Sequence, residues 1–241
     1  MPRIQFFNYN NNKIAYRFSK RSKKTLVFIH GLQSSMNGTK ATFFSKVAKK
    51  KNYSYLVMDL RGHGLSSGTF RELSIKDWYL DLVKIINFLK IEQIILVGSS
   101  MGGWLAINFS LLNQSKVIKL IGLAAAPDFT ELLLWKNFSN NIKSKILIKG
   151  IYKKRISKDF VYEYSDILIK QSRSMLTSKI KRRFVGDVIF FQGSKDLSVP
   201  FNYNNRFLNS DQFKNLTISI IKDADHSLSD IRSLKIIEKE I

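Results

Sequence analysis

The sequence predicts an α/β fold in which helices cover both faces of a mostly parallel central sheet. Short, mostly apolar runs alternate with segments of helical periodicity along much of the 241-residue chain. Such alternation with short connections is typical of parallel sheets. The length and the hydrophobic content of 44% are sufficient for one large globular domain. We therefore expect a single domain over residues 1–241.

The predicted strands are short and apolar, as expected for strands buried on both faces. The chain opens with MPRIQFFNYNNNKIAYRF, whose alternating pattern predicts strands on either side of an asparagine-rich turn. Further strands are predicted at 25–31, 55–64, 94–98, 120–127, 188–196 and 216–226.

Helical segments are predicted between these strands, at 43–50, 74–90 and 102–112. The second is the most regular, because its apolar residues recur at spacings of three and four and so form one face of a helix. These residues are Trp78, Leu82, Ile85, Ile86 and Leu89.

The alternation stops between about residues 127 and 186. This stretch carries 14 Lys and Arg against 5 Asp and Glu. We interpret it as a mainly helical insertion that forms a lid and is not a separate domain. Its apolar residues 132–135 would either line an acyl pocket or pack the insertion onto the rest of the domain.

The formal net charge of +22 raises the question of nucleic-acid binding. The basic residues are scattered over most of the chain, however, and no recognised nucleic-acid module is present. We therefore expect no specific nucleic-acid partner. The charge would still favour weak attraction to an anionic membrane or to an acyl carrier.

Several absences in the sequence predict a cytoplasmic protein. No apolar run approaches the roughly 18 residues of a membrane-spanning helix, and the start lacks the pattern of a secretory signal. The chain has no cysteine, which excludes disulfides, thiol nucleophiles and thiolate metal sites. Nothing in the sequence indicates the oligomeric state.

The stretch IILVGSSMGGW at 94–104 predicts a nucleophile. Gly98, Ser100 and Gly102 fit the spacing G-x-S-x-G, which selects Ser100 over its neighbour Ser99. The two glycines remove side chains that would collide on a sharp strand-to-helix turn. The amide of Met101, at the start of the next helix, is then expected to bind a developing oxyanion.

A serine hydroxyl needs a base to become nucleophilic at neutral pH. The chain has three histidines, and His226 follows the last predicted strand, where a loop returns to the carboxyl edge of the sheet. We assign the catalytic role to His226. His30 and His63 each lie beside a glycine in an earlier loop, and we assign them structural roles.

The imidazole of His226 in turn needs a carboxylate to fix its tautomer. We select Asp196, which follows a predicted strand in FFQGSKDLSVP. Asp128, at the end of the preceding strand, is a rival. Asp223 and Asp225 are close to His226 in sequence and are expected to be solvated loop carboxylates.

A second oxyanion donor is expected from the loop after the strand at 25–31. Gly31 lets the backbone approach the site closely, so that the amide of Leu32 points at the substrate oxygen. The D-x-R-G-H-G loop at 59–64 is expected to be scaffold that shapes the loops near the site.

With these residues in place, the chain resembles the serine hydrolases of the α/β-hydrolase fold. The motifs appear in family order: HGL (30–32), DLRGHGLSSG (59–68), VGSSMGGW (97–104), GSKD (193–196) and DH (225–226). A narrower similarity, to mitochondrial palmitoyl-protein thioesterases and their bacterial relatives, rests on SSMNGTKA (34–41), GSSMGGWL (98–105) and GSKDLSVP (193–200). The basic, asparagine-rich insertion departs from that branch.

The resemblance implies hydrolysis of acyl esters or thioesters by the triad Ser100, Asp196 and His226, without a metal or an organic cofactor. A serine at the elbow excludes the haloalkane and epoxide hydrolases, which use an aspartate there. Hydrolysis of carbon–carbon bonds and cofactor-free perhydrolysis stay open, because enzymes with these activities share the fold. A catalytically silent binding protein is a further alternative.

Overall fold

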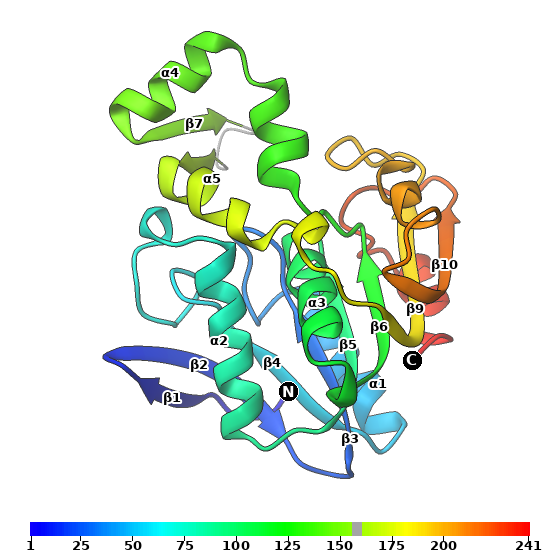
Figure 1. Cartoon of the computed structure of the whole chain (residues 1–241). Coiled ribbons are helices and arrows are strands. Elements are labelled where there is room, and N and C mark those ends of the chain that lie inside the picture. Colours follow the sequence, from blue (N-terminus) through cyan, green and yellow to red (C-terminus); the bar gives the residue numbers. More distant parts are fainter. Residues whose placement is uncertain (156–160) are drawn as a thin grey trace.

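A sheet of eight strands runs through the protein in the order β1-β2-β4-β3-β5-β6-β9-β10 (Figure 1). The computed structural model describes residues 1–155 and 161–241. Neighbouring strands from β4 to β10 are parallel, whereas β2 is antiparallel to both β1 and β4. The strands are β1 (Gln5–Tyr9), β2 (Asn12–Ser19), β3 (Lys24–Ile29), β4 (Ser54–Met58), β5 (Gln93–Ser99), β6 (Val117–Leu123), β9 (Phe184–Gly193) and β10 (Phe213–Ile221).

Helices cover both faces of this sheet, as the sequence predicts. Helices α2 (Ile75–Phe88) and α3 (Met101–Leu112) lie in front of the sheet in Figure 1, and α1 (Thr39–Lys50) lies behind it beside α6 (Ile231–Glu238). Short helical turns complete the connections: η1 (Phe70–Glu72), η2 (Gln114–Lys116) and η7 (Tyr203–Phe207).

The central strands contribute to two hydrophobic clusters, one on each face of the sheet. In β3, Val27 and Ile29 join the cluster that contains Trp104 of α3, while Leu26 and Phe28 belong to the cluster on the α1 side. Because both faces are buried, the strand sequences are apolar runs without alternation. This arrangement confirms the predicted α/β class.

Helix α2 begins where a capping box satisfies its first amides. The carboxylate of Asp77 accepts a hydrogen bond from the amide of Ser74 over 3.0 Å, and Ser74 precedes the first helical residue. The predicted apolar face is buried at Trp78, Leu82, Ile85 and Ile86.

The insertion occupies residues 124–183, between β6 and β9. It contains η3 (Thr130–Leu134), η4 (Trp135–Asn137), α4 (Asn140–Lys149), β7 (Ile151–Arg155), β8 (Val161–Ser165), α5 (Asp166–Ser172), η5 (Arg173–Met175) and η6 (Thr177–Lys179). The antiparallel hairpin of β7 and β8 adds a small sheet to the predicted helices. Gly150, with φ of 75°, ends α4 and lets the chain turn into β7.

Within residues 1–155 and 161–241, no helix is both long and apolar enough to cross a membrane.

Candidate active site

The predicted nucleophile lies on a strained turn between β5 and α3. Ser100 has φ of 53°, a left-handed conformation that costs energy for any residue with a side chain. A Cβ atom on Gly98 would lie 2.3 Å from the carbonyl oxygen of Gly102, and one on Gly102 would lie 2.4 Å from that of Ile29. Both positions therefore require glycine, as predicted.

The backbone around Ser100 holds this conformation in place. Its amide donates a hydrogen bond to the carbonyl of Leu123 over 2.9 Å, and its carbonyl accepts one from the amide of Ala126 over 3.0 Å. Both partners belong to or directly follow β6, the neighbouring strand. The sheet thus fixes the position from which the serine hydroxyl projects.

The structure brings Ser100, His226 and Asp196 together at the carboxyl edge of the sheet. Ser100 Oγ lies 3.1 Å from His226 Nε2, and His226 Nδ1 lies 2.8 Å from Asp196 Oδ2. An ionised carboxylate can only accept hydrogen bonds, so Nδ1 carries the imidazole proton. Nε2 is then left as the acceptor for the hydroxyl proton, which is the arrangement that a general base requires.

The carboxylate of Asp196 is held by donors on both of its oxygens. The amides of Ser198 and Val199 each donate to Oδ1 over 2.8 Å, and Gln192 Nε2 donates to Oδ2 over 2.8 Å. The side chain is fully buried. Asp196 is therefore fixed in the plane and direction in which it meets His226.

The rival carboxylate, Asp128, is bonded elsewhere. It accepts a hydrogen bond from the amide of Thr177 over 2.8 Å and pairs with Arg206 over 3.2 Å. Burial raises the pKa of Asp128, and these donors oppose that shift. Its contacts tie the start of the insertion to its returning segment, a structural role.

Asp223 and Asp225 also have partners other than the imidazole. Asp225 Oδ1 accepts from the amides of Ser227, over 2.9 Å, and Leu228, over 3.2 Å, and so shapes the turn that carries His226. Asp223 is exposed and pairs with Lys195 over 2.9 Å.

The predicted oxyanion residues lie next to the nucleophile. Gly31, Leu32 and Ser100 line one cavity of about 230 Å³, together with His226. A Cβ atom on Gly31 would be 3.3 Å from the Cβ of Ser100, which shows how closely this loop passes the elbow. Met101 is the first residue of α3. The assignment of the Leu32 and Met101 amides as oxyanion donors stays a prediction.

The rest of this cavity combines polar and apolar side chains. Lys40, Ser227 and Ser229 contribute to its wall, and Tyr162 reaches it from strand β8 of the insertion. Lys40 Nζ donates to the carbonyl of Ser227 and, over 3.2 Å, to Ser229 Oγ, which ties α1 to the loop that carries His226. Burial lowers the pKa of Lys40 to about 8.

Residues 132–135 lie away from this cavity. Leu132 lines a separate cavity of about 640 Å³ between the insertion and the segment before β10. The ring of Trp135 contacts the cationic groups of Lys143, at 5.7 Å, and Arg173, at 5.3 Å. For Trp135, these contacts favour the packing role, and Leu133 and Leu134 likewise pack against the hydrophobic core.

His30 and His63 have a role that the sequence did not reveal. The amide of Leu60 donates to His30 Nε2 over 3.3 Å, and the amide of Gln33 donates to His63 Nε2 over 3.1 Å. Both rings therefore act as neutral acceptors. Burial lowers the pKa of His30 to about 4 and that of His63 to about 3. The pair links the loop at 59–64 to the loop at 30–33.

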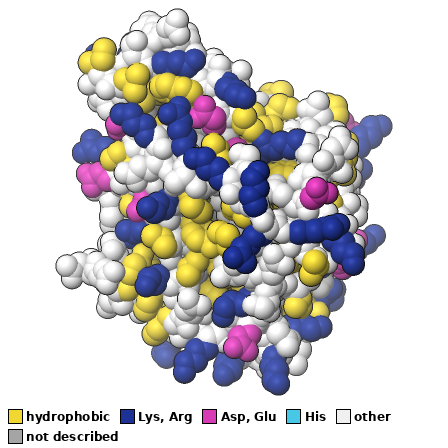
Figure 2. Space-filling view, in the orientation of Figure 1, with side chains coloured by type: hydrophobic (Ala, Val, Ile, Leu, Met, Phe, Trp, Pro, Cys, Tyr) yellow, Lys and Arg dark blue, Asp and Glu magenta, His cyan; other side chains and the backbone are white. Residues whose placement is uncertain are grey.

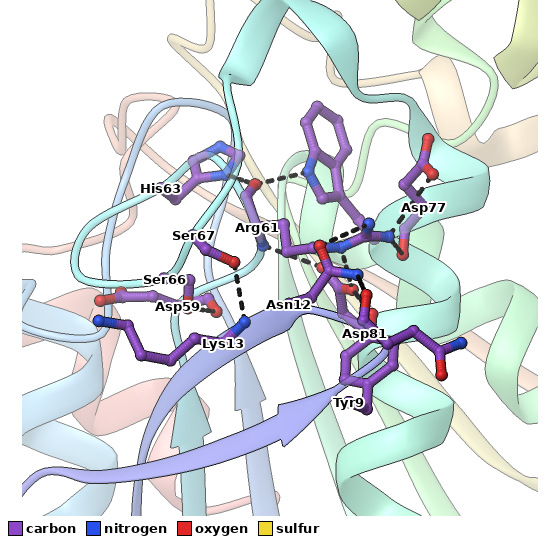
Figure 3. Close-up of polar contacts among 12 residues, drawn as sticks. Tyr9, Asn12, Lys13, Asp59, Arg61, His63, Ser66, Ser67, Asp77 and Asp81 are labelled. Carbon is purple, nitrogen blue, oxygen red and sulfur yellow. Dashed lines mark hydrogen bonds and ion pairs between the residues drawn. The ribbon is translucent and has the colours of Figure 1, made fainter.

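Figure 3 shows how the loop at 59–64 is anchored. Arg61 Nε donates to Asp81 Oδ1 over 2.7 Å, and the hydroxyl of Tyr9 donates to the same oxygen over 2.5 Å. Trp78 Nε1 donates to the carbonyl of Arg61 over 2.9 Å. Strand β1, helix α2 and this loop thus form one partly buried network around the buried Asp81, which agrees with the predicted scaffold role.

Known proteins resemble this chain over most of its length. This chain is 28% identical over 228 residues to the mitochondrial palmitoyl-protein thioesterase ABHD10 of Bos taurus. The alignment covers 93% of this chain and 74% of the relative. That relative carries a mitochondrial name, so the cytoplasmic location of this chain stays a prediction.

Solved structures share the fold. A putative hydrolase from Agrobacterium vitis superposes with a TM-score of 0.90 at 23% identity, over 100% of this chain and 97% of that one. The mouse alpha/beta hydrolase domain-containing protein 10 gives a TM-score of 0.88 at 24% identity, over 99% and 96% of the two chains.

The family described as Hydrolase_4 (serine aminopeptidase, S33) matches residues 20–183, which is more than half of the chain. This match includes β3, the elbow at Ser100 and the whole insertion. The chain belongs to the Hydrolase_4 family and is a hydrolase of the α/β-hydrolase fold.

Proposed function

We propose that this hydrolase cleaves carboxylic ester or thioester bonds of acyl substrates through a triad of Ser100, His226 and Asp196. The observation that carries the proposal is the continuous chain of hydrogen bonds from Ser100 Oγ to His226 Nε2, 3.1 Å, and from His226 Nδ1 to Asp196 Oδ2, 2.8 Å. The thioesterase name of the ABHD10 relatives supports the substrate class.

In the first half of the reaction, His226 Nε2 takes the hydroxyl proton as Ser100 Oγ attacks the acyl carbonyl carbon. The carbonyl electron pair moves onto oxygen, where the amides of Leu32 and Met101 hold the negative charge. Asp196 stabilises the imidazolium that forms. When the oxyanion collapses, His226 returns its proton to the departing thiol or alcohol, and the acyl group stays on Ser100.

The second half releases the acid. Water takes the place of the leaving group, gives a proton to His226 Nε2 and attacks the acyl-enzyme carbonyl. The tetrahedral intermediate collapses, Ser100 Oγ leaves and recovers the proton from the imidazole, and the carboxylic acid departs. The same three side chains serve both halves.

We further propose that residues 1–241 form one domain and that the insertion acts as a lid. Tyr162 is the basis for this role, because it reaches the cavity of Ser100 from strand β8. The polar part of its wall, with Lys40 and the hydroxyls of Ser227 and Ser229, suits the polar end of a leaving group.

The experiment compares the wild type with Ser100→Ala on p-nitrophenyl esters and acyl-CoA thioesters of graded chain length. We expect turnover and fluorophosphonate labelling in the wild type and the loss of both in Ser100→Ala. The adjacent Ser99→Ala is the matched control and should still be labelled. The proposal would be refuted if fluorophosphonate labelling persisted in Ser100→Ala. It would also be refuted if the wild-type protein showed neither turnover nor labelling.

A further inference from the structure

The far end of the insertion carries exposed apolar side chains. Helix α4 and strand β7 project from the rest of the molecule (Figure 1). On α4, Ile148 is 81% exposed and Leu147 is 53% exposed. Neighbouring Ile146 is fully buried and anchors the helix. Much of Leu147 and most of Ile148 is therefore left outside the packing of the insertion.

Cationic side chains surround this apolar pair. Exposed lysines flank it on α4 and continue onto β7, and neither segment contains an aspartate or a glutamate. Figure 2 shows hydrophobic side chains beside Lys and Arg over this projecting end. We call this surface the tip patch; it consists of Lys145, Leu147, Ile148, Lys149, Lys153 and Lys154.

The neighbouring acidic group neutralises little of this charge. Glu163 of β8 pairs with Lys153 over 2.6 Å. In the part of the chain that the structure describes, no acidic side chain forms a salt bridge with Lys145, Lys149 or Lys154. The tip patch thus keeps a net positive charge around two aliphatic side chains.

We propose that the tip patch docks the protein onto an anionic phospholipid bilayer. Lysines near such a surface are attracted to its negative potential, and exposed aliphatic side chains gain free energy by entering the interface. A nucleic acid would satisfy the lysines but offers no apolar environment for Leu147 and Ile148. The combination of both kinds of side chain favours the bilayer.

The tip patch is directly connected to the proposed active site. Lys154 of β7 lies opposite Tyr162 of β8 in the hairpin, and Tyr162 lines the cavity of Ser100. Docking would therefore bring the covering element of that cavity to the lipid surface. This link rests on the proposed function, whereas the docking itself does not.

The test measures co-sedimentation of the full chain with vesicles of phosphatidylcholine alone or with phosphatidylglycerol added. The variant Lys145→Gln/Ile148→Ser/Lys149→Gln removes part of the tip patch. The matched control, Ile231→Ser/Lys235→Gln/Lys239→Gln, changes the same residue types on α6 and at its C-cap Lys239, and Ile231 is 63% exposed. Ser100→Ala is included to separate docking from catalysis.

We expect the wild type, Ser100→Ala and the α6 control to bind the anionic vesicles, and to bind pure phosphatidylcholine at least tenfold more weakly. The tip variant should lose more than tenfold in binding, since each cation near the surface contributes about fivefold. Its hydrolysis of a soluble short-chain ester should match the wild type, so a failure of docking and a failure of the proposed catalysis are distinguishable.

Three results would overturn the proposal. The first is a failure of the wild-type protein to bind anionic vesicles. The second is an equal loss of vesicle binding in the tip variant and in the α6 control. The third is retention on RNA or DNA that depends on the tip patch while vesicle binding does not.

Discussion

The amide of Gln33 donates a hydrogen bond to Nε2 of His63 over 3.1 Å. This contact joins two loops that are about thirty positions apart in the sequence, and one of them carries the proposed oxyanion donor Leu32. His63 is packed edge-on against Trp78, with ring centroids 5.2 Å apart, so the acceptor is rigidly placed. His63 takes no part in the proposed chemical steps. It does position the loop whose Leu32 amide is the proposed oxyanion donor.

Replacement of His63 by leucine should slow catalysis. The variant leaves the amide of Gln33 without its acceptor and frees the loop at 30–33, so we expect kcat to fall about tenfold, less than the 10²- to 10³-fold cost of deleting an oxyanion donor. His63→Gln keeps an acceptor oxygen and should recover part of the rate. Steady-state kinetics would contradict this role if both variants changed KM alone.

Stability should fall as the medium is acidified below pH 6.5. The pKa values of His30 and His63 are lowered to about 4 and about 3 in the folded protein, so the unfolded chain binds protons first as the pH drops. Each histidine should cost roughly 3 kcal/mol at pH 4 relative to neutral pH. Denaturant titrations at several pH values measure this slope. A His63→Gln variant should have a shallower slope, and an unchanged slope would assign the effect to other groups.

Asp196→Asn should nearly abolish turnover while the fold is kept. The amide cannot stabilise the imidazolium, and an asparagine nitrogen facing His226 Nδ1 favours the wrong tautomer, so we expect a loss of about 10⁴ in kcat. Asp223→Asn, at an exposed carboxylate on a neighbouring loop, should retain wild-type kinetics. Comparable losses in the two variants would show that charge near the site, and not the bond to His226, determines the rate.

Gly98→Ala should destabilise the protein by about 2 kcal/mol or more, since its methyl group would lie 2.3 Å from the backbone oxygen of Gly102. Gly38→Ala is the control, because the nearest atom to its methyl group is 3.7 Å away. Gly38 is the half-buried N-cap of α1, and alanine at this position should cost about 1 kcal/mol or less. Thermal unfolding of both variants checks the difference, and equal melting temperatures would contradict the close contact.

Tyr162→Ala should alter substrate binding, and Tyr152→Ala should not. Tyr162 lines the cavity of Ser100, whereas Tyr152 of the other hairpin strand contacts Phe138 inside the insertion, with ring centroids 5.7 Å apart. We expect Tyr162→Ala to raise KM severalfold at nearly unchanged fluorophosphonate labelling. Parallel changes in the two variants would indicate a general loosening of the insertion.

The sequence predicted the sheet and the grouping of the site because both depend on strong local patterns. Apolar runs identify β3, β5 and β6, and glycines at 98 and 102 leave a single serine at the elbow. The carboxyl ends of parallel strands meet at one edge, so Asp196 and His226 could be placed beside Ser100 by chain order alone.

The insertion could not be predicted to the same extent. Its hairpin is packed through aromatic rings on both strands, since Phe138 contacts Tyr152 of β7 at 5.7 Å and Tyr164 of β8 at 5.9 Å. These strands are short, and such short segments show no clear strand or helix period in the sequence. The role of His63 was hidden for a different reason. It depends on a contact with Gln33 that only the folded chain brings together, and a histidine beside glycines in a loop does not reveal its partner.

The order of strands has a consequence for when activity appears. Ser100 follows β5, whereas His226 follows β10, the edge strand of the sheet, with 126 positions between the two residues. The serine has no base until β10 has docked on β9, because a loop that long closes late in folding. A refolding chain should therefore regain its secondary structure first and its ability to react with an acyl group last. Active-site labelling during refolding would time the completion of the fold.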